Sequence, residues 1–381
     1  MIAFTLYAIL IHRGRAIPYL LGLLSILPGL VWNFYYFGSL TGGYARYGSS
    51  LHRFTFKQFL DSTLGLLLSP SRGLLIFSPI VLYAIPGLFQ LSKPPHRQDE
   101  QLVICLGMSS SLLLLSYSFY EIWWGGHCYG PRFMTDILPI LGYGLNYSLV
   151  SACKRRGEFW GATPRFSLLF SVLVLFSVFT QTVGAFGLAT GAAGRTAPTP
   201  NFWNEIPIDM NQEKLWNWQD NQIRRHTSSV IHRLLPPPVS STTYQQQLQG
   251  NILDIQGPHG VSLSRKFACI QGSVEQLTAQ VKNTGQATWF GYLAALPQGE
   301  ARIQVTYYLD QQKLSQSRLY IPNQVAPGQT ADALGFFACP RKTGTYYLTF
   351  DLVSEYIGEI PLPTQEDRLR LIYQLAVVAA P

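Results

Sequence analysis

A polar and aromatic stretch, residues 121–136, holds the side chains whose types and spacing could do chemistry. Its sequence is EIWWGGHCYGPRFMTD, and its ionisable groups are Glu121, His127, Arg132 and Asp136. The stretch lies directly between two long apolar runs, where charge is costly and is usually functional. Carboxylates move protons, and the arginine fork binds phosphate oxygens in pairs. We therefore interpret the stretch as the floor of an active site.

An ordinary loop at a membrane surface would show the same composition. In that interpretation Trp123 and Trp124 are interfacial aromatics, and Arg132 extends toward lipid headgroups. A lone histidine such as His127 is also more often a structural group than a catalytic one. Composition alone leaves the active-site and loop interpretations open.

The elements that must position this stretch are apolar runs in the first half of the chain. Their lengths approach or exceed the roughly 20 residues that cross a bilayer as a helix. Prolines interrupt several of them, which neighbouring helices tolerate in a membrane. We expect a multi-pass α-helical membrane domain over residues 1–188, with a short N-terminal stub and about five spans. The runs are 16–37, 73–91, 102–120, 137–153 and 166–194.

Charge distribution predicts the orientation of these spans and excludes one class of partner. The net charge is +8, and its surplus belongs to the first half of the chain. Loops 12–15, 92–101 and 154–165 are richer in Lys and Arg than loops 38–72 and 121–132, so they are expected on the cytoplasmic side. Residues 121–136 and the whole carboxy-terminal half are then on the outer side. No basic stripe is left for a phosphate backbone, so we expect no nucleic-acid partner.

The second half of the chain alternates with period two and carries turn signals. We expect a linker over residues 189–260, with a short helical motif at 215–225, and an all-β immunoglobulin-like sandwich over 261–381. The turn signals are the segments 283–285, 326–328 and 342–344. The expected strands are 277–281, 303–309, 314–321, 333–339, 346–353 and 369–378, with 261–269 as a possible seventh.

The five cysteines give no evidence for a metal or redox site. There is no CxxC and no Cys/His cluster at metal spacing, so we expect neither a metal nor a cofactor. Cys269 and Cys339 both lie in the second half and could pair if that half is exported. Spacing alone does not show whether their Cα atoms come close enough.

Short motifs in an unusual order give a family resemblance over about residues 16–225. Together they resemble bacterial multi-pass C-type (GT-C) glycosyltransferases, relatives of the dolichyl-phosphate-mannose protein mannosyltransferases and of the lipid A aminoarabinose transferases. The second half resembles immunoglobulin-like domains with an Asn-x-Gly turn and a following Trp, here Asn283, Gly285 and Trp289. The motifs of the first half are FGSLTGGY at 37–44, SPSRG at 69–73 with FSP at 77–79, WGG at 124–126 with YGPRF at 129–133, and LWNW at 215–218.

The resemblance implies inverting transfer of a sugar from a polyprenyl-phosphate carrier to a glycan or protein acceptor, on the outer face of a bacterial inner membrane. Its partners would be the lipid-linked sugar, the acceptor and membrane lipid. The family's catalytic acidic residue lies in a first outer loop that this chain does not include, so the catalytic residue is unknown. The alternative is a non-catalytic, membrane-anchored module that binds glycan or protein. Candidate substrate contacts are Arg72 and Arg132 on the phosphate, His127 and Tyr129 shaping the pocket, and Glu121, Asp136 and Trp124 around them.

Overall fold

The computed structural model describes most of the chain. The described residues are 5, 7–9, 13–40, 42, 55–91, 98–120, 122–126, 128–156, 164–187, 212–296, 298–369 and 371–379. They divide into two compact units, residues 1–181 and 182–381. The expected linker, 189–260, contains the helices α10 (Gln222–Leu234) and α11 (Thr242–Gln246) and the strand β1 (Gly250–Gln256), all within the second unit.

The prediction of a multi-pass α-helical membrane domain is wrong. Among the described residues, two helices are long and apolar enough to cross a membrane: 100–118 within α7 (Gln98–Ser118) and 168–186 within α9 (Pro164–Phe186). The other expected spans are shorter, broken or less apolar. The remaining helices of the first unit are η2 (Arg13–Ala16), α2 (Ile17–Gly22), η3 (Leu23–Ile26), α3 (Leu27–Phe37), α4 (Phe56–Leu68), α5 (Leu74–Phe77), η6 (Pro79–Tyr83), α6 (Ala84–Leu91), η7 (Arg132–Ile137) and α8 (Leu138–Arg156).

Proline explains one of these breaks. It lacks a backbone N–H and ends or kinks a helix. Ser78 has φ −143° and ψ 64°, so α5 ends there, and Pro79 begins η6. The run 73–91 therefore forms three short pieces where an unbroken span was expected. Apolar composition alone does not reveal such breaks.

Close helix packing in the first unit depends on two glycines. A Cβ added to Gly87 of α6 would lie 1.9 Å from the carbonyl oxygen of Gly144 in α8. A Cβ added to Gly144 would lie 2.8 Å from the carbonyl oxygen of Ala84. The backbones of α6 and α8 therefore touch at a point where no side chain fits. This contact brings two sequence-distant apolar runs together.

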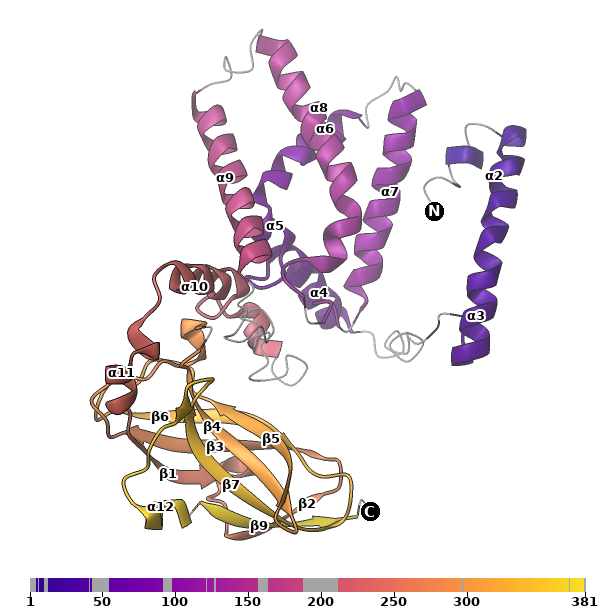
Figure 1. Ribbon diagram of the computed structural model, residues 1–381. Coiled ribbons are helices and arrows are strands. Elements are labelled where there is room, and N and C mark those ends of the chain that lie inside the picture. Colours follow the sequence, from indigo (N-terminus) through magenta and orange to yellow (C-terminus); the bar gives the residue numbers. More distant parts are fainter. Residues whose placement is uncertain are drawn as a thin grey trace. The chain divides into compact units, whose positions relative to one another are not determined.

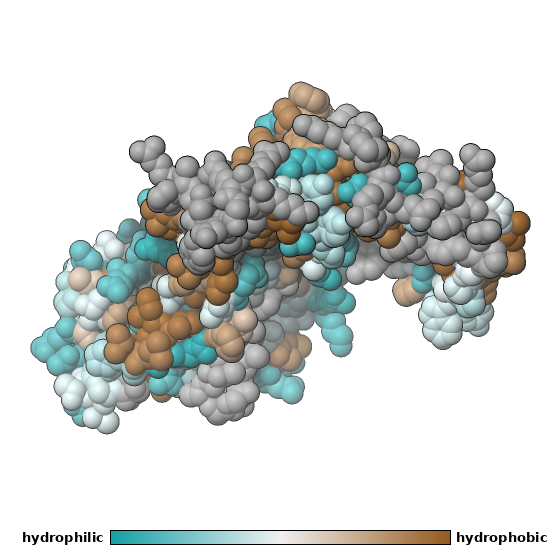
Figure 2. All heavy atoms as spheres, turned by 90° about the horizontal axis from the view of Figure 1, so that it is seen from above, coloured by the Kyte–Doolittle hydropathy of each residue, from teal (hydrophilic) through white to brown (hydrophobic). Residues whose placement is uncertain are grey.

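Among the described residues, little of the two long apolar helices is buried. About 11% of the residues of the candidate span 100–118 are buried, and about 17% of those of the span 168–186. Large apolar side chains of α9, such as Leu168, Leu175 and Val178, are exposed. In the view from above, apolar side chains lie at the surface beside polar ones (Figure 2). Exposed apolar area of this kind marks a surface that contacts lipid or protein.

The second unit contains one strongly curled sheet in place of the expected two-sheet sandwich (Figure 1). Its strand order is β1-β3-β6-β5-β4-β7-β9-β2, with β8 added beside β7. Strands β5 and β6 pair only at Tyr320 and Leu334, so the sheet bends sharply there. The strands are β1 (Gly250–Gln256), β2 (Lys266–Ile270), β3 (Val274–Asn283), β4 (Ala301–Leu309), β5 (Gln312–Tyr320), β6 (Thr330–Ala338), β7 (Gly344–Ser354), β8 (Gly358–Glu359) and β9 (Ile372–Val378).

Alternating apolar residues make the core of this unit. In β3, Leu277, Ala279 and Val281 are buried, and the residues between them are more exposed. This period-two burial places the apolar face of each strand inside the curl. Trp289 and Phe337 are fully buried at its centre.

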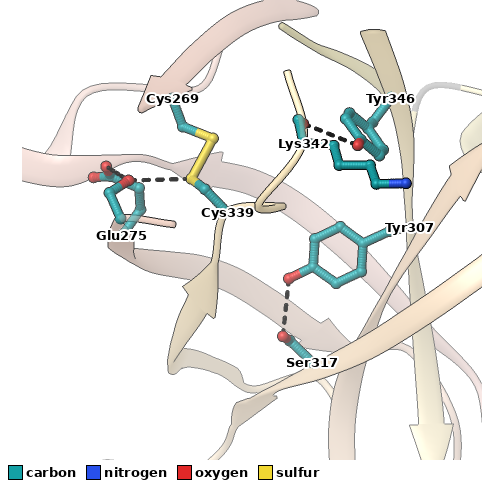
Figure 3. Close-up of a disulfide and its surroundings, with 8 residues drawn as sticks. Cys269, Glu275, Tyr307, Ser317, Cys339, Lys342 and Tyr346 are labelled. Carbon is teal, nitrogen blue, oxygen red and sulfur yellow. Dashed lines mark hydrogen bonds between the residues drawn. A yellow bond between two sulfur atoms is a disulfide. The ribbon is translucent and has the colours of Figure 1, made fainter. Parts of the chain in front are cut away.

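Cys269 and Cys339 form a disulfide (Figure 3). Cys269 lies in β2, at one edge of the sheet, and Cys339 follows β6, near the other edge. Their Cα atoms are 6.4 Å apart. The bond therefore links the β2 edge of the curled sheet to the end of β6, which lies five strands away in the strand order. Near this bond, the Tyr346 hydroxyl donates to the Lys342 carbonyl at 3.0 Å.

Removing the disulfide is expected to destabilise the second unit. The two cysteines are separated by 70 residues, and a loop of that size corresponds to about 4 kcal/mol of stabilisation in the chain-entropy account. The measurement is urea unfolding of the full chain in mild detergent, without reductant, comparing wild type with the double variant Cys269→Ala, Cys339→Ala. Cys105→Ala, at an unpaired cysteine, is the control. Equal unfolding midpoints for the double variant and wild type would show that the bond is dispensable.

Candidate functional site

Arg72 follows a tight turn that its own sequence explains. The hydroxyl oxygen of Ser69 accepts from the backbone N–H groups of Ser71 and Arg72, both at 3.2 Å. The N–H of Gly73 donates to the Ser69 carbonyl at 2.7 Å, and a Cβ on Gly73 would lie 2.6 Å from the Ser69 nitrogen. Only glycine fits this approach. The SPSRG motif therefore forms a turn that aims Arg72 inward, between α4 and α5.

The guanidinium of Arg72 is buried and binds backbone carbonyls. The residue is 2% exposed. Its Nε donates to the Trp124 carbonyl at 2.8 Å and its Nη2 donates to the Gly126 carbonyl at 2.9 Å. Its Nη1 donates to the Ser71 carbonyl at 3.1 Å. Burial lowers the pKa of Arg72 to about 10. Arg72 thus fixes the loop that contains the WWGG residues.

The tryptophans of that loop are packed inward. Trp123 and Trp124 are buried, with ring centroids 6.1 Å apart and an edge-to-face arrangement. A Cβ on Gly65 of α4 would lie 2.4 Å from the Trp123 ring, so this indole lies directly on the α4 backbone. Gly125 and Gly126 have φ of +72° and +71°, which glycine adopts without strain. The WWGG pattern therefore serves packing and a turn.

Tyr129 connects the loop to α9. Its hydroxyl donates to the Thr180 carbonyl at 2.7 Å, and its ring packs edge-to-face on Phe77 at 5.1 Å between centroids. Burial raises the pKa of Tyr129 above its usual value. The hydroxyl of Thr180 in turn donates to the Phe77 carbonyl at 2.6 Å. These contacts give Tyr129 a structural role.

Arg132 and Asp136 are exposed on η7, four positions apart in the sequence. They are the ionisable members of the predicted site that the structure leaves open to solvent or lipid. The structure thus brings Arg72 and Trp124 together in one contact network, to which neither Arg132 nor Asp136 contributes a described hydrogen bond. Glu121 and His127 lie outside the described residues. The assignment of these side chains to a substrate stays a prediction.

A second candidate site lies in the curled sheet, where sequence reasoning placed none. It is a polar pocket of about 230 Å³. Strand β1, the segment before β2, the short helix α12 (Gln365–Leu369) and strand β9 supply its walls. The lining residues are Asn251, Ile252, Leu253, Asp254, Ile255, Arg265, Asp367, Leu371 and Tyr373.

A β-bulge in β1 aims two polar side chains toward this pocket. The pairing with β3 skips Leu253, so Ile252 and Ile255 both face the core and are buried. Regular alternation would put residues three apart on opposite faces. Because of the bulge, Asn251 and Asp254 also share one face, and they line the pocket. Bulges of this kind redirect side chains beside binding sites.

Some polar groups of the pocket already make hydrogen bonds within the protein, and others do not. Asp254 accepts from the Ser262 hydroxyl at 2.9 Å and from the Gln256 amide at 3.0 Å. The hydrogen bond from Gln256 is the main cause that lowers the pKa of Asp254. Within the described part of the chain, neither the Asn251 amide nor the Tyr373 hydroxyl has a side-chain hydrogen bond, so both remain available to a ligand.

Arg265 and Asp367 complete the charged wall. The Arg265 guanidinium lies 5.0 Å from the centroid of the Tyr373 ring, and its Nη1 donates to the Ile372 carbonyl at 3.2 Å. Asp367 accepts from the Thr364 hydroxyl at 2.7 Å. Burial raises the pKa of Tyr373, so its hydroxyl stays protonated and can donate.

This mixture of groups suits a ligand rich in hydroxyls. Carboxylates accept, a guanidinium donates, and an amide and a phenol do both. The two carboxylates outnumber the one cation among the lining residues, which disfavours an acidic ligand. The described residues contain no group of three or more His, Cys, Asp or Glu side chains that could hold a metal ion. The pocket therefore has the chemistry for a small neutral or amino sugar.

Only one weak signal in the sequence marked this pocket. Its residues come from four segments between 251 and 373, and the bulge that aligns Asn251 with Asp254 breaks the alternation that indicates a strand. That signal is the polar pair Asn251 and Asp254 beside the apolar residues of the segment GNILDIQ.

Comparison with known proteins gives no family. No protein-family model and no curated protein sequence matches the chain. Three examples of solved structures that resemble part of it follow. The CARDB domain of a Pyrococcus furiosus protein is 13% identical, with a TM-score of 0.20, 35% of this chain covered and 94% of that chain covered. A Niemann-Pick type C2 protein from Japanese carpenter ant is 9% identical, with a TM-score of 0.24, and the match covers 34% of this chain and 93% of that chain. The C-terminal domain of wzt is 16% identical, with a TM-score of 0.24, and the match covers 35% of this chain and 77% of that chain. Likenesses this weak carry no argument about function.

Proposed function

We propose that this protein is a membrane-attached, non-catalytic module that binds glycan through its curled β-sheet. The pocket between β1, α12 and β9 is the observation that carries the proposal. It combines two carboxylates, a guanidinium, a free amide and a free phenol in about 230 Å³. That volume is below the range of drug-sized pockets, so it suits one sugar residue of a longer chain.

Attachment to a membrane is supported by the exposed apolar helices α7 and α9. Both helices are long and apolar enough to cross a bilayer, and little of either is buried. The Cys269–Cys339 disulfide favours an oxidising compartment for the second unit, outside the cytoplasm. We propose that the second unit lies on the extracytoplasmic face of a bacterial inner membrane.

Sugar transfer from a polyprenyl phosphate, which the family resemblance implies, remains a second proposal. The exposed Arg132 is the observation that favours it, because a side chain open to the surroundings could bind a phosphate. Arg72, Trp124 and Tyr129 support it less, since their polar groups or rings hold the loop in place. The binding function is therefore the better supported of the two.

The proposed binding function is tested with a glycan array probed by the full chain in mild detergent. Wild type is expected to retain glycans that end in neutral or amino sugars. Asp254→Asn, titrated against a retained glycan, is expected to lower the affinity about tenfold or more, because hydrogen bonds to a charged group are lost.

Asp332→Asn is the matched control for that titration. Asp332 is another strand aspartate, exposed on β6 and not among the residues that line the pocket. It is expected to bind as wild type does. Equal affinities for Asp254→Asn and wild type, or retention of acidic glycans alone, would contradict the proposed site.

A further inference from the structure

Helix α10 (Gln222–Leu234) buries four polar side chains, whereas apolar side chains near its carboxyl end are exposed. Gln222, Arg225, His226 and Ser229 are buried. Leu234 and the following Leu235 are 75% and 74% exposed, and Ile231, on the same face, is also exposed. A helix on the surface of a water-soluble domain shows the reverse pattern. The outer face of α10 is therefore built for an apolar environment.

Part of the buried polar face contacts other residues of the second unit. Arg225 donates to the Asp220 carboxylate at 2.8 Å, and its guanidinium lies 4.7 Å from the centroid of the Tyr292 ring. His232 contacts the Ala294 carbonyl at 2.7 Å. These contacts fix α10 on the loop that leads into β4. They also fix which face of the helix points outward.

Helix α10 is joined to the carboxyl end of α9, whose last residues belong to the same unit. His226 Nδ1 lies 3.1 Å from the Val183 carbonyl oxygen, and Arg233 donates to the Phe186 carbonyl. The last carbonyls of a helix have no partner within it, and cationic or donor side chains satisfy them. Figure 1 shows α10 beside this end of α9.

Two exposed tryptophans lie in the sequence just before the amino terminus of α10. Trp216 ends η9 (Gln212–Trp216), and Trp218 follows it at 62% exposed. Tryptophans gather where a membrane meets water, because the ring is apolar and its N–H is polar. Arg224 is exposed on the same helix and can reach headgroups.

We infer that α10, together with Trp216 and Trp218, lies in the interface of the lipid bilayer that α9 enters. The side chains of Ile231, Leu234 and Leu235 insert among the acyl segments nearest the headgroups. The buried polar face of α10 contacts the rest of the second unit. This inference rests on the proposed membrane attachment through α9. It does not depend on glycan binding. Because the contact is mainly apolar, high salt is expected to leave it intact.

The test measures the depth of spin labels in phosphatidylcholine vesicles that contain the full chain. Labels are placed singly at Leu234→Cys and Leu235→Cys, in a background with Cys105, Cys128 and Cys153 replaced by Ala. Collisions with oxygen, which concentrates in lipid, are compared with collisions with a water-soluble nickel complex. The oxygen-to-nickel ratio is expected to be several times higher at both positions than at Leu314→Cys. Leu314, an exposed leucine of β5, is the matched control.

A further label at Leu175→Cys, an exposed position of α9, separates the possible failures. A low ratio at Leu175 would show that α9 does not enter lipid and would overturn both the attachment and the inference. A high ratio at Leu175 with ratios at Leu234 and Leu235 equal to that of Leu314 would overturn the inference alone. Glycan affinity, measured on the same samples, reports separately on the proposed binding function.

Discussion

Replacing Asn283 with Asp is expected to lower the free energy of unfolding of the second unit by about 3–5 kcal/mol, because it leaves a buried charge without a partner. Asn283 is fully buried. Its amide nitrogen donates to the carbonyls of Ala287 and Val325, both at 2.8 Å. Its amide oxygen accepts from the Gly285 N–H at 3.0 Å. An aspartate would place negative charge against two carbonyl oxygens and would lose both donors.

The control for this substitution is Asn323→Asp, at an exposed position of the same unit. Surface changes of this kind usually alter stability by no more than about 0.5 kcal/mol. Both variants are compared with wild type by urea unfolding of the full chain in mild detergent, followed by near-ultraviolet circular dichroism. If Asn283→Asp and Asn323→Asp unfold at the same urea concentration, the Asn283 hydrogen bonds do not stabilise this turn.

Arg72→Lys is expected to destabilise the first unit by about 2–4 kcal/mol, although the charge is kept, because lysine cannot reproduce the planar fork that serves three carbonyls. Two of those carbonyls, of Trp124 and Gly126, would lose their arginine donors in a site that is almost closed to water. The loop 122–126 is then expected to be cut by protease well before the wild-type loop. Limited proteolysis with mass spectrometry, run beside thermal unfolding, measures both effects.

Arg132→Lys is the matched control for Arg72, since Arg132 is exposed. It is expected to leave stability and cleavage unchanged. If Arg72→Lys is as stable as wild type, the guanidinium does not hold the loop, and Arg72 becomes a candidate ligand contact again.

The strands of the second unit were largely predictable, because period-two burial and turn residues are local signals. Segments 277–281, 303–309 and 346–353 lie within β3, β4 and β7. The turn at Pro327-Gly328 is present, with Gly328 at φ +79°. Strand β1 was missed because its bulge at Leu253 interrupts the alternation. The two-sheet arrangement was wrong because pairing between β5 and β6, at Tyr320 and Leu334, is a tertiary contact that no local pattern encodes.

The helical unit was predicted less well, because apolar composition does not determine where a helix breaks. Ser78 and Pro79 end one expected span, and the rest of that run forms η6 and α6. The role of Arg72 was equally hidden. Its partners, the carbonyls of Trp124 and Gly126, are backbone groups more than fifty positions away, and backbone acceptors leave no mark in a sequence.

The pocket in the sheet shows the same limit for function. Asp254, Arg265 and Tyr373 meet only because the sheet curls and β9 pairs parallel with β2. The sequence pattern of each segment indicates a strand but does not indicate a binding site. The ionisable residues of 121–136 attracted attention because they are close in sequence, whereas the candidate glycan contacts are close only in space.

The most direct test of the glycan-binding account is photo-crosslinking with a glycan that carries a diazirine on its terminal sugar. The full chain is irradiated with the probe, digested, and the modified peptides are identified by mass spectrometry. The account predicts modification within residues 251–255, at Arg265, or within 367–373, and its loss when unlabelled glycan competes. Competable modification confined to residues 122–133 would contradict the account and would place the ligand at the loop that Arg72 holds.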